Sequence, residues 1–253
     1  MNGPLNSRPI IAVIQARMTS TRLPGKVLAT ICGTSLLELL VSRLSRAALL
    51  DGIIVATSEN AADDPIADLS AALGLACHRG SENDVLSRFD GAAAQAEACT
   101  VVRITGDCPL IDAEIVDQSI NAFLSSGADY ASNTLIRTYP IGMDTEVFKV
   151  SALRDAARRG DGPEEREHVT PYLYRNPDRF VLHSVAAPES LRAPELRLTV
   201  DTAEDLELVT KIFEALLPSN PAFGLEDILQ LLRIHPDWLQ INRHVPHRWL
   251  AAT

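Results

Sequence analysis

The chain has 253 residues, of which 46% are hydrophobic and 5% aromatic, and it carries a formal net charge of −10. This length suffices for one α/β domain with a sizeable core, which Leu, Ile, Val and Ala must fill because aromatic residues are few. The acidic balance argues against non-specific binding to nucleic acids or membrane surfaces, because both require a basic surface.

The sequence also indicates the location of the protein and the redox state of its cysteines. No apolar run reaches the about 20 residues needed to cross a bilayer, and residues 1–9 lack the basic-then-apolar pattern of a signal peptide. We therefore expect a cytoplasmic protein. The cysteines are scattered without a CxxC pair, at Cys32, Cys77, Cys99 and Cys108. This spacing disfavours a disulfide or zinc framework and predicts buried free thiols.

The first half of the chain alternates short β-branched runs with segments of helical periodicity. Predicted strands cover 10–14, 52–57, 75–78 and 100–105, and predicted helices cover 35–48, 63–73, 83–98 and 112–125. We expect Ser35 and Asp112 to cap two of these helices, and Asn83 or Ser81 to lie near the cap of a third. This alternation predicts a mainly parallel sheet with helices on both faces. Ligands of such sheets bind at the carboxyl ends of the strands.

The second half is less regular. Predicted strands cover 129–133, 144–148, 180–186 and 196–200, and predicted helices cover 151–159, 163–174, 202–216 and 225–234. Thr202 is the expected cap of the helix that follows it. The tail, 235–253, is expected to be docked coil or an oligomer contact. No repeat or low-complexity linker marks a boundary, so we treat 1–253 as a single domain.

A basic loop, 15–26, follows the first predicted strand. It contains Arg17, Arg22 and Lys26, with three hydroxyl residues between the arginines. Forked arginine donors, a lysine point charge and backbone amides together suit a triphosphate. The loop has neither GxxxxGK[ST] nor GxGxxG. A solvated basic loop is the simpler interpretation, but such a density of cations at a strand end in an acidic chain favours phosphate binding.

Two aspartates come directly after predicted strands. Asp107 follows 100–105 and is preceded by Gly106, which permits close backbone approach. Asp201 follows 196–200 and precedes a helix. Mg²⁺ takes one or two carboxylates together with substrate phosphates and water. The pair could therefore hold Mg²⁺ if the two strands are neighbours. A turn-forming role for Asp107 and a capping role for Asp201 are the alternatives.

Several strings in the chain resemble the cytidylyltransferases that make CMP-activated acidic sugars, the CMP-Kdo and CMP-sialic acid synthetases. They are QARMTSTRLPGKVL, RITGDCPLID and LTVDTAEDLELV. The segments RGSENDVLSRF, YPIGMDTEVF and EREHVTPYLYRNP, in this order, resemble the spore-coat polysaccharide biosynthesis branch. The resemblance covers residues 10 to about 216. It implies a three-layer, Rossmann-like fold of the GT-A type, with CTP as co-substrate, Mg²⁺ as metal and a homodimer as assembly.

The resemblance also implies residue roles. The triphosphate ligands would be Arg17, Ser20, Arg22 and Lys26. Asp107 and Asp201 would hold the metal, and with Arg17 and Lys26 they are the expected catalytic residues. The base and ribose would lie near Gln15, Ala16, Arg79, Asp84 and Arg88, with Gln15 standing where these enzymes usually have proline. Residues 10–125 would form the nucleotide-binding half, 126–216 the acceptor-binding and dimerisation half, and 217–253 a C-terminal helix and tail.

The expected reaction is attack of an acceptor oxygen on the α-phosphorus of CTP, with pyrophosphate leaving. It requires in-line positioning and charge neutralisation. The acceptor-side candidates are Arg137, Glu146, Arg166, Glu167 and His168. His168 could act as a base toward a sugar hydroxyl. Alternatively, 164–167 are acidic first-turn residues favoured by the helix dipole. A nonulosonic acid, a Kdo-like sugar, a sugar phosphate and a phosphonate all remain open as acceptors.

Three other functions are alternatives. A transferase for another nucleotide, such as UTP, usually has a glycine-rich loop, whereas this stretch has only Gly25 before Gly33. A GT-A glycosyltransferase generally needs a DxD motif, whereas 106–109 read GDCP. A non-catalytic nucleotide-binding subunit is disfavoured by the retention of both the basic and the acidic groups.

Overall fold

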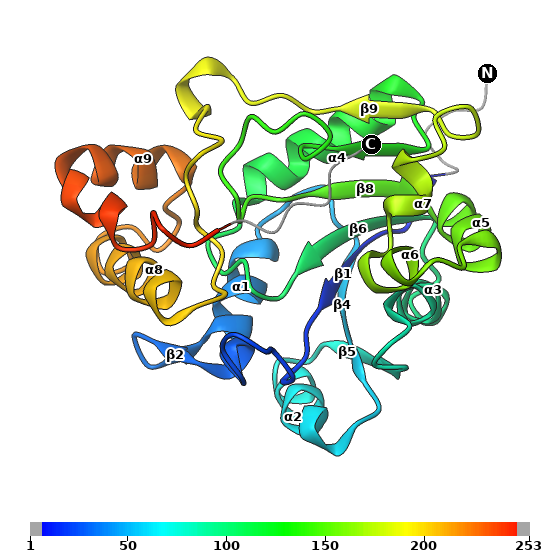
Figure 1. The fold of residues 1–253 in the computed structure, drawn as a ribbon, viewed down its shortest axis with the longest axis horizontal. Coiled ribbons are helices and arrows are strands. Elements are labelled where there is room, and N and C mark those ends of the chain that lie inside the picture. Colours follow the sequence, from blue (N-terminus) through cyan, green and yellow to red (C-terminus); the bar gives the residue numbers. More distant parts are fainter. Residues whose placement is uncertain (1–6, 247–253) are drawn as a thin grey trace.

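A seven-stranded sheet forms the centre of the molecule, in the order β5-β4-β1-β6-β8-β7-β9 (Figure 1). The computed structural model describes residues 7–246. The strands are β1 (Ile10–Gln15), β4 (Gly52–Ser58), β5 (Ala76–Gly80), β6 (Thr100–Thr105), β7 (Tyr130–Ser132), β8 (Glu146–Lys149) and β9 (Leu182–Ser184). Only β8 runs against its neighbours; all other pairings in the sheet are parallel. The predicted mainly parallel α/β fold is confirmed.

Helices cover both faces of this sheet. They are α1 (Leu36–Leu44), α2 (Asp64–Ala72), α3 (Val85–Gln95), α4 (Ala113–Ser126), α5 (Val150–Arg159), α6 (Pro163–His168), α7 (Pro171–Tyr174), α8 (Ala203–Leu216) and α9 (Leu225–Ile234). Side chains of a strand alternate between faces. Ile10, Ala12 and Ile14 therefore pack with α1, α2 and α4, whereas Ile11 and Val13 pack with α3, α5 and α7.

The last two long helices build a third apolar cluster beside the sheet. Leu208 and Ile212 of α8 and Ile228 of α9 pack with Leu36 and Leu39 of α1. Figure 1 shows α8 and α9 together at one end of the molecule, next to α1. Among the described residues, no helix combines the length and the apolar character that a bilayer crossing demands.

Most element boundaries agree with the sequence patterns. The strand at 100–105 and the helix at 225–234 match to the residue. The side chains of Ser35, Asp112 and Thr202 accept backbone N–H groups at the starts of α1, α4 and α8. The cap of α3 is Asp84, which accepts the N–H of Ser87 at 2.9 Å, so the cap lies near Asn83 and Ser81 as predicted. A two-stranded hairpin, β2 (Thr30–Ile31) with β3 (Thr34–Ser35), was not foreseen.

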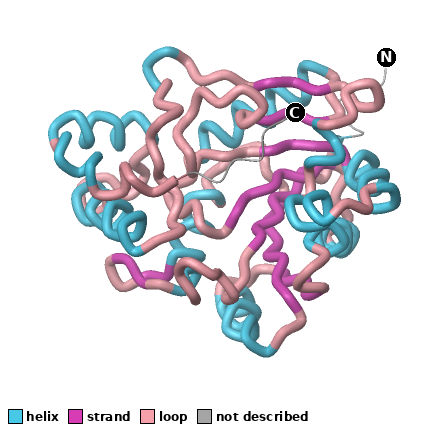
Figure 2. Tube along the Cα trace, in the orientation of Figure 1, coloured by secondary structure: helices cyan, strands magenta, loops and turns pink. Residues whose placement is uncertain are grey.

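The predicted strand at 196–200 is absent. Figure 2 shows that the chain between β9 and α8 runs mostly as loop, and the segment forms a single bridge, between Ile141 and Arg197. Leu198 donates its N–H to the Ile141 carbonyl at 2.7 Å, and Val200 donates to the Asp107 carbonyl at 2.8 Å. The alternating apolar pattern of 196–200 reflected burial against two loops, which satisfy the backbone groups of this segment in place of a neighbouring strand.

The predicted helix at 163–174 is two helices, α6 and α7. Val169 has φ of +71° and breaks the helix. Pro171 follows at the first position of α7, and because it has no backbone N–H it cannot donate to the last turn of α6. The break is buried, because Val169 and Thr170 are 0% and 2% exposed. The prediction of buried thiols holds for Cys108 but not for Cys32, which is exposed.

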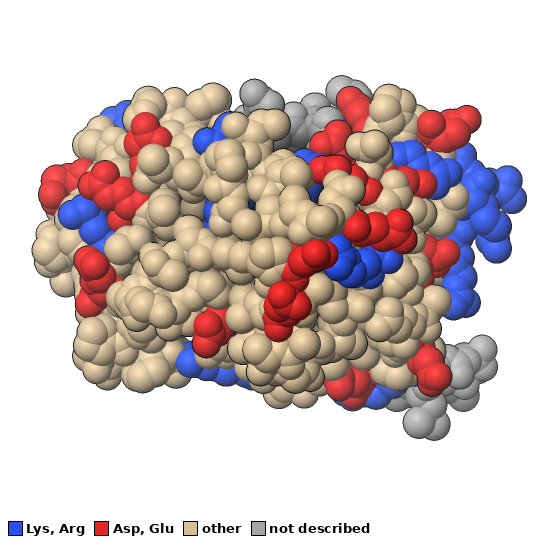
Figure 3. Space-filling view, turned by 90° about the horizontal axis from the view of Figure 1, so that it is seen from below, with Lys and Arg blue, Asp and Glu red and all other residues tan. Residues whose placement is uncertain are grey.

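Charges are mixed over the face drawn in Figure 3. Acidic and basic side chains lie side by side near its centre, and most of the face carries neither. Basic side chains also gather along the right-hand edge of this face.

Candidate active site

The carboxyl ends of β1 and β6 bring two functional loops together. Gln15 of β1 lies in register with Thr105 of β6. One residue further, Gly106 donates its N–H to the Gln15 carbonyl at 2.8 Å, and a Cβ on Gly106 would lie 2.8 Å from that same oxygen. Only glycine permits this approach. The loops that carry Lys26 and Asp107 therefore leave the sheet side by side.

Lys26 joins the two predicted metal aspartates. Its Nζ lies 2.7 Å from Asp107 Oδ2 and 2.7 Å from Asp201 Oδ1. Arg22 Nη2 lies 2.9 Å from Asp201 Oδ2. Lys26 is only 8% exposed, so these are charge-assisted contacts that are largely shielded from water. Four residues predicted from three separate motifs thus form one cluster.

Asp201 reaches Asp107 without a strand pairing. Thr199 donates its hydroxyl to the Asp107 carbonyl at 3.1 Å, and Val200 donates its N–H to the same oxygen. Gly142 makes room for this segment: its φ is +104°, and a Cβ there would lie 2.7 Å from the carbonyl carbon of Leu198. The condition of neighbouring strands is not met, yet the two carboxylates converge.

Ionic contacts set the charge states of this cluster. Burial alone would lower the pKa of Lys26, but Asp107 and then Asp201 outweigh it and the pKa is raised. Burial would likewise raise the pKa of Asp201, but Lys26, Arg197 and Arg22 bring it below the ordinary value. Lysine and aspartate are therefore both charged at neutral pH.

The carboxylate pair fits a divalent cation whose other ligands come from elsewhere. Asp107 and Asp201 direct one oxygen each at the same positive charge, that of Lys26. Within residues 7–246, no group of three or more His, Cys, Asp or Glu side chains is arranged to hold a metal. Two carboxylates completed by substrate phosphates and water are the preferred surroundings of Mg²⁺.

The basic loop is held by a buried carboxylate that the sequence reading did not single out. Asp63 accepts the N–H of Met18 at 2.7 Å and that of Ser58 at 3.1 Å, and it is 0% exposed. Ser20 lies in the tight turn that follows, where its N–H donates to the Met18 carbonyl at 2.9 Å. Asp63 therefore fixes the loop to the end of β4. Burial would raise its pKa, but hydrogen bonds from Ser58 and Met18 lower it.

Arg88 of α3 is buried and has two nitrogen donors without a partner within residues 7–246. It is 1% exposed, and its Nη1 donates to the Ser81 carbonyl at 2.7 Å. Its Nε and Nη2 have no hydrogen-bond partner among the described residues. Burial, and then the charge of Arg17, lower the pKa of Arg88. A buried guanidinium with unused donors suits an incoming polar ligand.

The other residues predicted near the base differ in whether their polar groups are already hydrogen-bonded within the protein. Arg79 has used its donors on the Ser58 and Asn60 carbonyls, at 2.9 and 2.8 Å, and pairs with Asp64 at 2.7 Å. The structure therefore does not bring Arg79 to the Lys26 cluster. Ala16 is buried, and the Gln15 side chain accepts from Arg103 Nη2 at 3.3 Å.

Glu146 lies at the start of β8 in a buried network. Its carboxylate accepts from Arg103, from the Tyr130 hydroxyl at 2.6 Å and from the Thr170 hydroxyl at 2.6 Å. Glu146 is 6% exposed. These contacts favour a structural role, in which Glu146 holds Arg103 against Gln15. Arg137, the other candidate on this side, makes a forked contact with Asp144 at 2.7 and 2.9 Å.

Helix α6 reaches across to the nucleotide side. Arg166 Nη1 lies 3.2 Å from Asp84 Oδ2, at the cap of α3. Glu167 Oε1 lies 3.9 Å from Arg17 Nη2. His168 is half-buried, and burial lowers its pKa below 6.5 against the opposing effect of Glu167. Predicted acceptor residues and predicted nucleotide residues therefore face one another.

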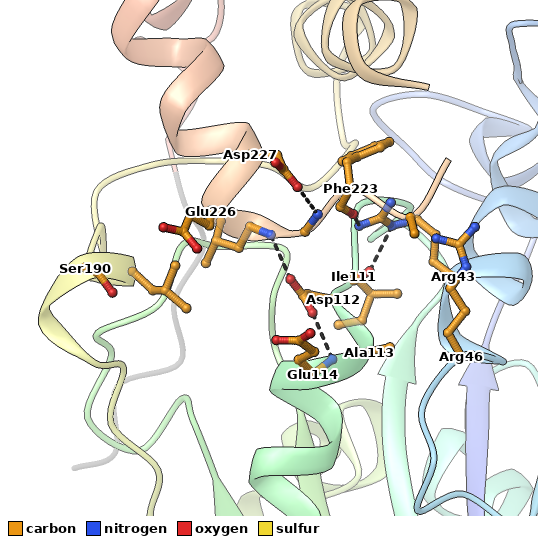
Figure 4. Close-up of a pocket in the computed structure, with 14 residues that line it drawn as sticks. Arg43, Arg46, Ile111, Asp112, Ala113, Glu114, Ser190, Phe223, Glu226 and Asp227 are labelled. Carbon is orange, nitrogen blue, oxygen red and sulfur yellow. Dashed lines mark hydrogen bonds between the residues drawn. The ribbon is translucent and has the colours of Figure 1, made fainter. Parts of the chain in front are cut away.

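A separate pocket of about 420 Å³ lies between α1, α4 and α9 (Figure 4). Asp112 accepts the N–H of Glu114 at 2.8 Å and that of Leu225 at 2.7 Å, so one carboxylate caps both α4 and α9. Arg43 donates to the carbonyls of Ile111 and Phe223, each at 2.9 Å. Arg43 Nη1 is buried without a hydrogen-bond partner among the described residues, and none of the predicted site residues lines the pocket. It is a structural joint between the sheet and the C-terminal helices.

Arg197 is a further residue of the site that sequence reasoning missed. Its Nη2 lies 2.6 Å from Asp201 Oδ2. The alternating segment 196–200 contained the signal, because Arg197, Thr199 and Asp201 share one face of an extended chain. Its partner Asp205 gave no signal beyond the acidic first turn of a helix.

Comparison with known proteins gives a family. The model of the cytidylyltransferase family matches residues 11–240. The spore coat polysaccharide biosynthesis protein SpsF of Bacillus subtilis is 36% identical, over 90% of this chain and 95% of its own length. The 3-deoxy-manno-octulosonate cytidylyltransferase of Rhizobium johnstonii is 29% identical, over 81% of this chain and 96% of its own. A solved cytidylyltransferase of Leptospira borgpetersenii superposes with a TM-score of 0.86 at 31% identity, covering 96% of this chain and 99% of that one. With this match over most of its length, the chain belongs to the cytidylyltransferase family and is a nucleotidyltransferase.

Proposed function

We propose that the protein catalyses the Mg²⁺-dependent transfer of CMP from CTP to an acidic sugar or sugar-phosphate-like acceptor, with release of pyrophosphate, in surface polysaccharide or glycoconjugate biosynthesis. The observation that carries the proposal is the contact of Lys26 with both Asp107 and Asp201 at the carboxyl end of β6. This cluster places cations for a triphosphate directly beside carboxylates for a metal.

The roles of the phosphate-side residues follow from their charge and position. Arg17, Arg22 and Lys26 neutralise the phosphates of CTP, and backbone N–H groups around Ser20 add neutral donors. Asp107 and Asp201 would hold Mg²⁺. When bound, the metal supplies charge stabilisation at the phosphate under attack. The protein itself contributes position and charge, which is most of what a phosphoryl-type displacement requires.

Base and ribose recognition belong to the ends of β1 and β5 and the start of α3. We propose that Gln15, Ala16 and Arg88 meet the cytosine, and that Asp84 and Arg79 shape the surrounding loop. The unused donors of Arg88 support its part. Arg79 and Asp84 act through the groups they already hold, the Ser58 and Asn60 carbonyls for Arg79 and Arg166 for Asp84.

The acceptor binds between α6 and the phosphate loop. Arg137, Arg166, Glu167 and His168 are the proposed contacts, and Glu146 supports them from behind through Arg103 and Thr170. The names of the relatives, one a 3-deoxy-manno-octulosonate cytidylyltransferase and one a spore coat polysaccharide protein, support an acidic sugar. Because the pKa of His168 is lowered, its imidazole is neutral at pH 7 and can accept a proton from a sugar hydroxyl.

A pyrophosphate-release assay tests this function. Each of the four common NTPs is supplied with Mg²⁺ and a panel of acidic sugars, sugar phosphates and phosphonates, and reactions without acceptor give the background. Release with CTP and one acceptor class is the expected result. Release of pyrophosphate with another NTP would mean that the co-substrate is that NTP and not CTP. Release of nucleoside diphosphate would indicate a glycosyltransferase. CTP binding without any release over the whole panel would contradict the proposed reaction.

We propose further that the enzyme works in the cytoplasm, where nucleoside triphosphates are supplied, and that it assembles as a homodimer through residues 126–216. Light scattering coupled to size-exclusion chromatography measures the assembly. The expected mass is twice the 27.5 kDa of the chain, and a monomer at the enzyme's working concentration would contradict the dimer.

A further inference from the structure

Within residues 7–246, three cations contact Asp201, and they come from two segments of the chain. Lys26 and Arg22 belong to the basic loop and lie 2.7 and 2.9 Å away. Arg197 belongs to the segment that leads into Asp201, and its Nη2 lies 2.6 Å from Oδ2. Lys26 contacts Oδ1, whereas both arginines share Oδ2. Lys26 and Arg22 are the proposed phosphate ligands, so they can leave Asp201 when CTP binds. Arg197 is not a proposed phosphate ligand, so its contact with Asp201 can persist.

Arg197 is held in place by a second carboxylate. Its Nε lies 2.9 Å from Asp205 Oδ1, and its Nη2 lies 3.0 Å from Asp205 Oδ2. Asp205 is 0% exposed and also accepts the N–H groups of Asp201, at 2.9 Å, and of Thr202, at 3.1 Å. A forked, buried pair of this kind has fixed geometry. Arg197, itself 5% exposed, therefore cannot turn toward a substrate without breaking the pair.

The C-terminal segment completes the arrangement. Asn242 Nδ2 donates to Asp205 Oδ1 at 2.8 Å and to the Arg197 carbonyl at 3.1 Å. Asn242 is 4% exposed. It lies beyond the helical turn at Pro236–Gln240, and it contacts both members of the Arg197–Asp205 pair.

We propose that Arg197, Asp205 and Asn242 are positioning residues for Asp201: they fix Oδ2 and leave Oδ1 as the oxygen that a divalent cation takes. The inference rests on the proposed function, in which Asp201 holds the metal. Partners behind a metal ligand orient it, and their loss typically weakens metal binding about 10- to 100-fold. The C-terminal segment, for which sequence reasoning expected only docked coil or an oligomer contact, thereby acts on the metal site.

The test measures Mn²⁺ binding in place of Mg²⁺. Water proton relaxation is followed during Mn²⁺ titration of the full-length protein at saturating CTP, with Mn²⁺ and CTP alone as the baseline. We expect Asn242→Ala to weaken Mn²⁺ binding about 10-fold, and Asp205→Asn about 10- to 100-fold. The affinity for CTP without metal should stay unchanged in both variants, because neither Asp205 nor Asn242 contacts the basic loop, 15–26, in the described contacts. Gln240→Ala, which removes an exposed amide from the same segment, should behave like the wild type.

Each outcome decides the inference. Mn²⁺ affinity within twofold of wild type in folded Asn242→Ala and Asp205→Asn overturns it. An equal loss in Gln240→Ala also overturns it, because the effect would then be general loosening of the segment. Asp107→Asn distinguishes a failure of the proposed metal site from a failure of the proposed positioning residues. If Asp107→Asn binds Mn²⁺ as tightly as the wild type, the proposed metal site itself is overturned. If Asp107→Asn loses Mn²⁺ binding but Asn242→Ala keeps it, only the positioning role of Arg197, Asp205 and Asn242 is overturned. Where Asp205→Asn does not fold, Asn242→Ala decides, because it removes no charge.

Discussion

Replacement of Lys26 by methionine tests whether the lysine ammonium stands in for a metal cation. The substitution removes the charge that lies 2.7 Å from both Asp107 and Asp201 and keeps an unbranched side chain of similar length. Removing one partner of a buried ion pair costs about 3–5 kcal/mol. We expect a loss near the lower limit, about 3 kcal/mol, because the side chains of Asp107 and Asp201 remain 23% and 15% exposed.

A divalent cation should reverse this loss in the variant. At free Mn²⁺ about 100-fold above its dissociation constant, binding to the native state adds about 2.7 kcal/mol. The wild type should gain much less without nucleotide, because Lys26 competes for the same two oxygens. Urea unfolding followed by circular dichroism, with and without Mn²⁺, measures both effects.

Lys149→Met is the matched control for this experiment. Lys149 pairs with Asp129 at 2.8 Å, but its side chain is 44% exposed, and exposed pairs contribute about 0–1 kcal/mol. Its variant should lose little stability and gain nothing from Mn²⁺. Equal Mn²⁺ stabilisation of wild type and Lys26→Met, or a Lys26→Met protein as stable as wild type without metal, would refute the reasoning.

Three further substitutions separate the other roles. Asp107→Asn should abolish pyrophosphate release with an unchanged circular dichroism spectrum, because an amide oxygen still accepts from Lys26; near-normal turnover would remove Asp107 from the metal site. Asp63→Asn should loosen the phosphate loop and raise KM for CTP. Because the folded pKa of Asp63 is lowered, its stabilisation should be full above about pH 5 and disappear as the pH falls through 3.8 toward the folded pKa; a pH-independent difference in urea unfolding would contradict this. Glu146→Gln should destabilise by about 3 kcal/mol, because Arg103 stays buried without its partner; unchanged stability with a raised KM for the acceptor would assign Glu146 to acceptor binding.

The order of elements could be predicted because it depends on short-range periodicity. Residues 100–105 and 225–234 combine a clear pattern with clear ends, so tertiary context had nothing to override. Residues 196–200 alternate apolar and polar side chains like a strand but pack against loops. Periodicity reports burial, and it cannot tell whether the neighbouring backbone is a strand. The break at Val169 was equally hidden, since a β-branched residue rarely adopts a positive φ.

The candidate site was predictable where its residues follow strands in sequence. Arg22, Lys26 and Asp107 lie just past the ends of β1 and β6, and the rule for parallel sheets brings them together. The supporting residues were not predictable in this way. Asp63 and Asp205 matter because of the N–H groups and guanidinium that they contact after folding, and these contacts span loops that leave no periodic trace.

The carboxylate of Asp112, shared by the starts of α4 and α9, ties together parts of the chain that emerge from the ribosome at different times. Its two oxygens accept N–H groups separated by 111 residues, those of Glu114 and Leu225. The contact between Lys26 and Asp201 spans 175 residues. Pairings this distant form late, because the intervening chain must first be ordered. Until residue 201 has left the ribosome, both aspartates cannot lie beside Lys26, so catalytic competence cannot arise before that point of synthesis.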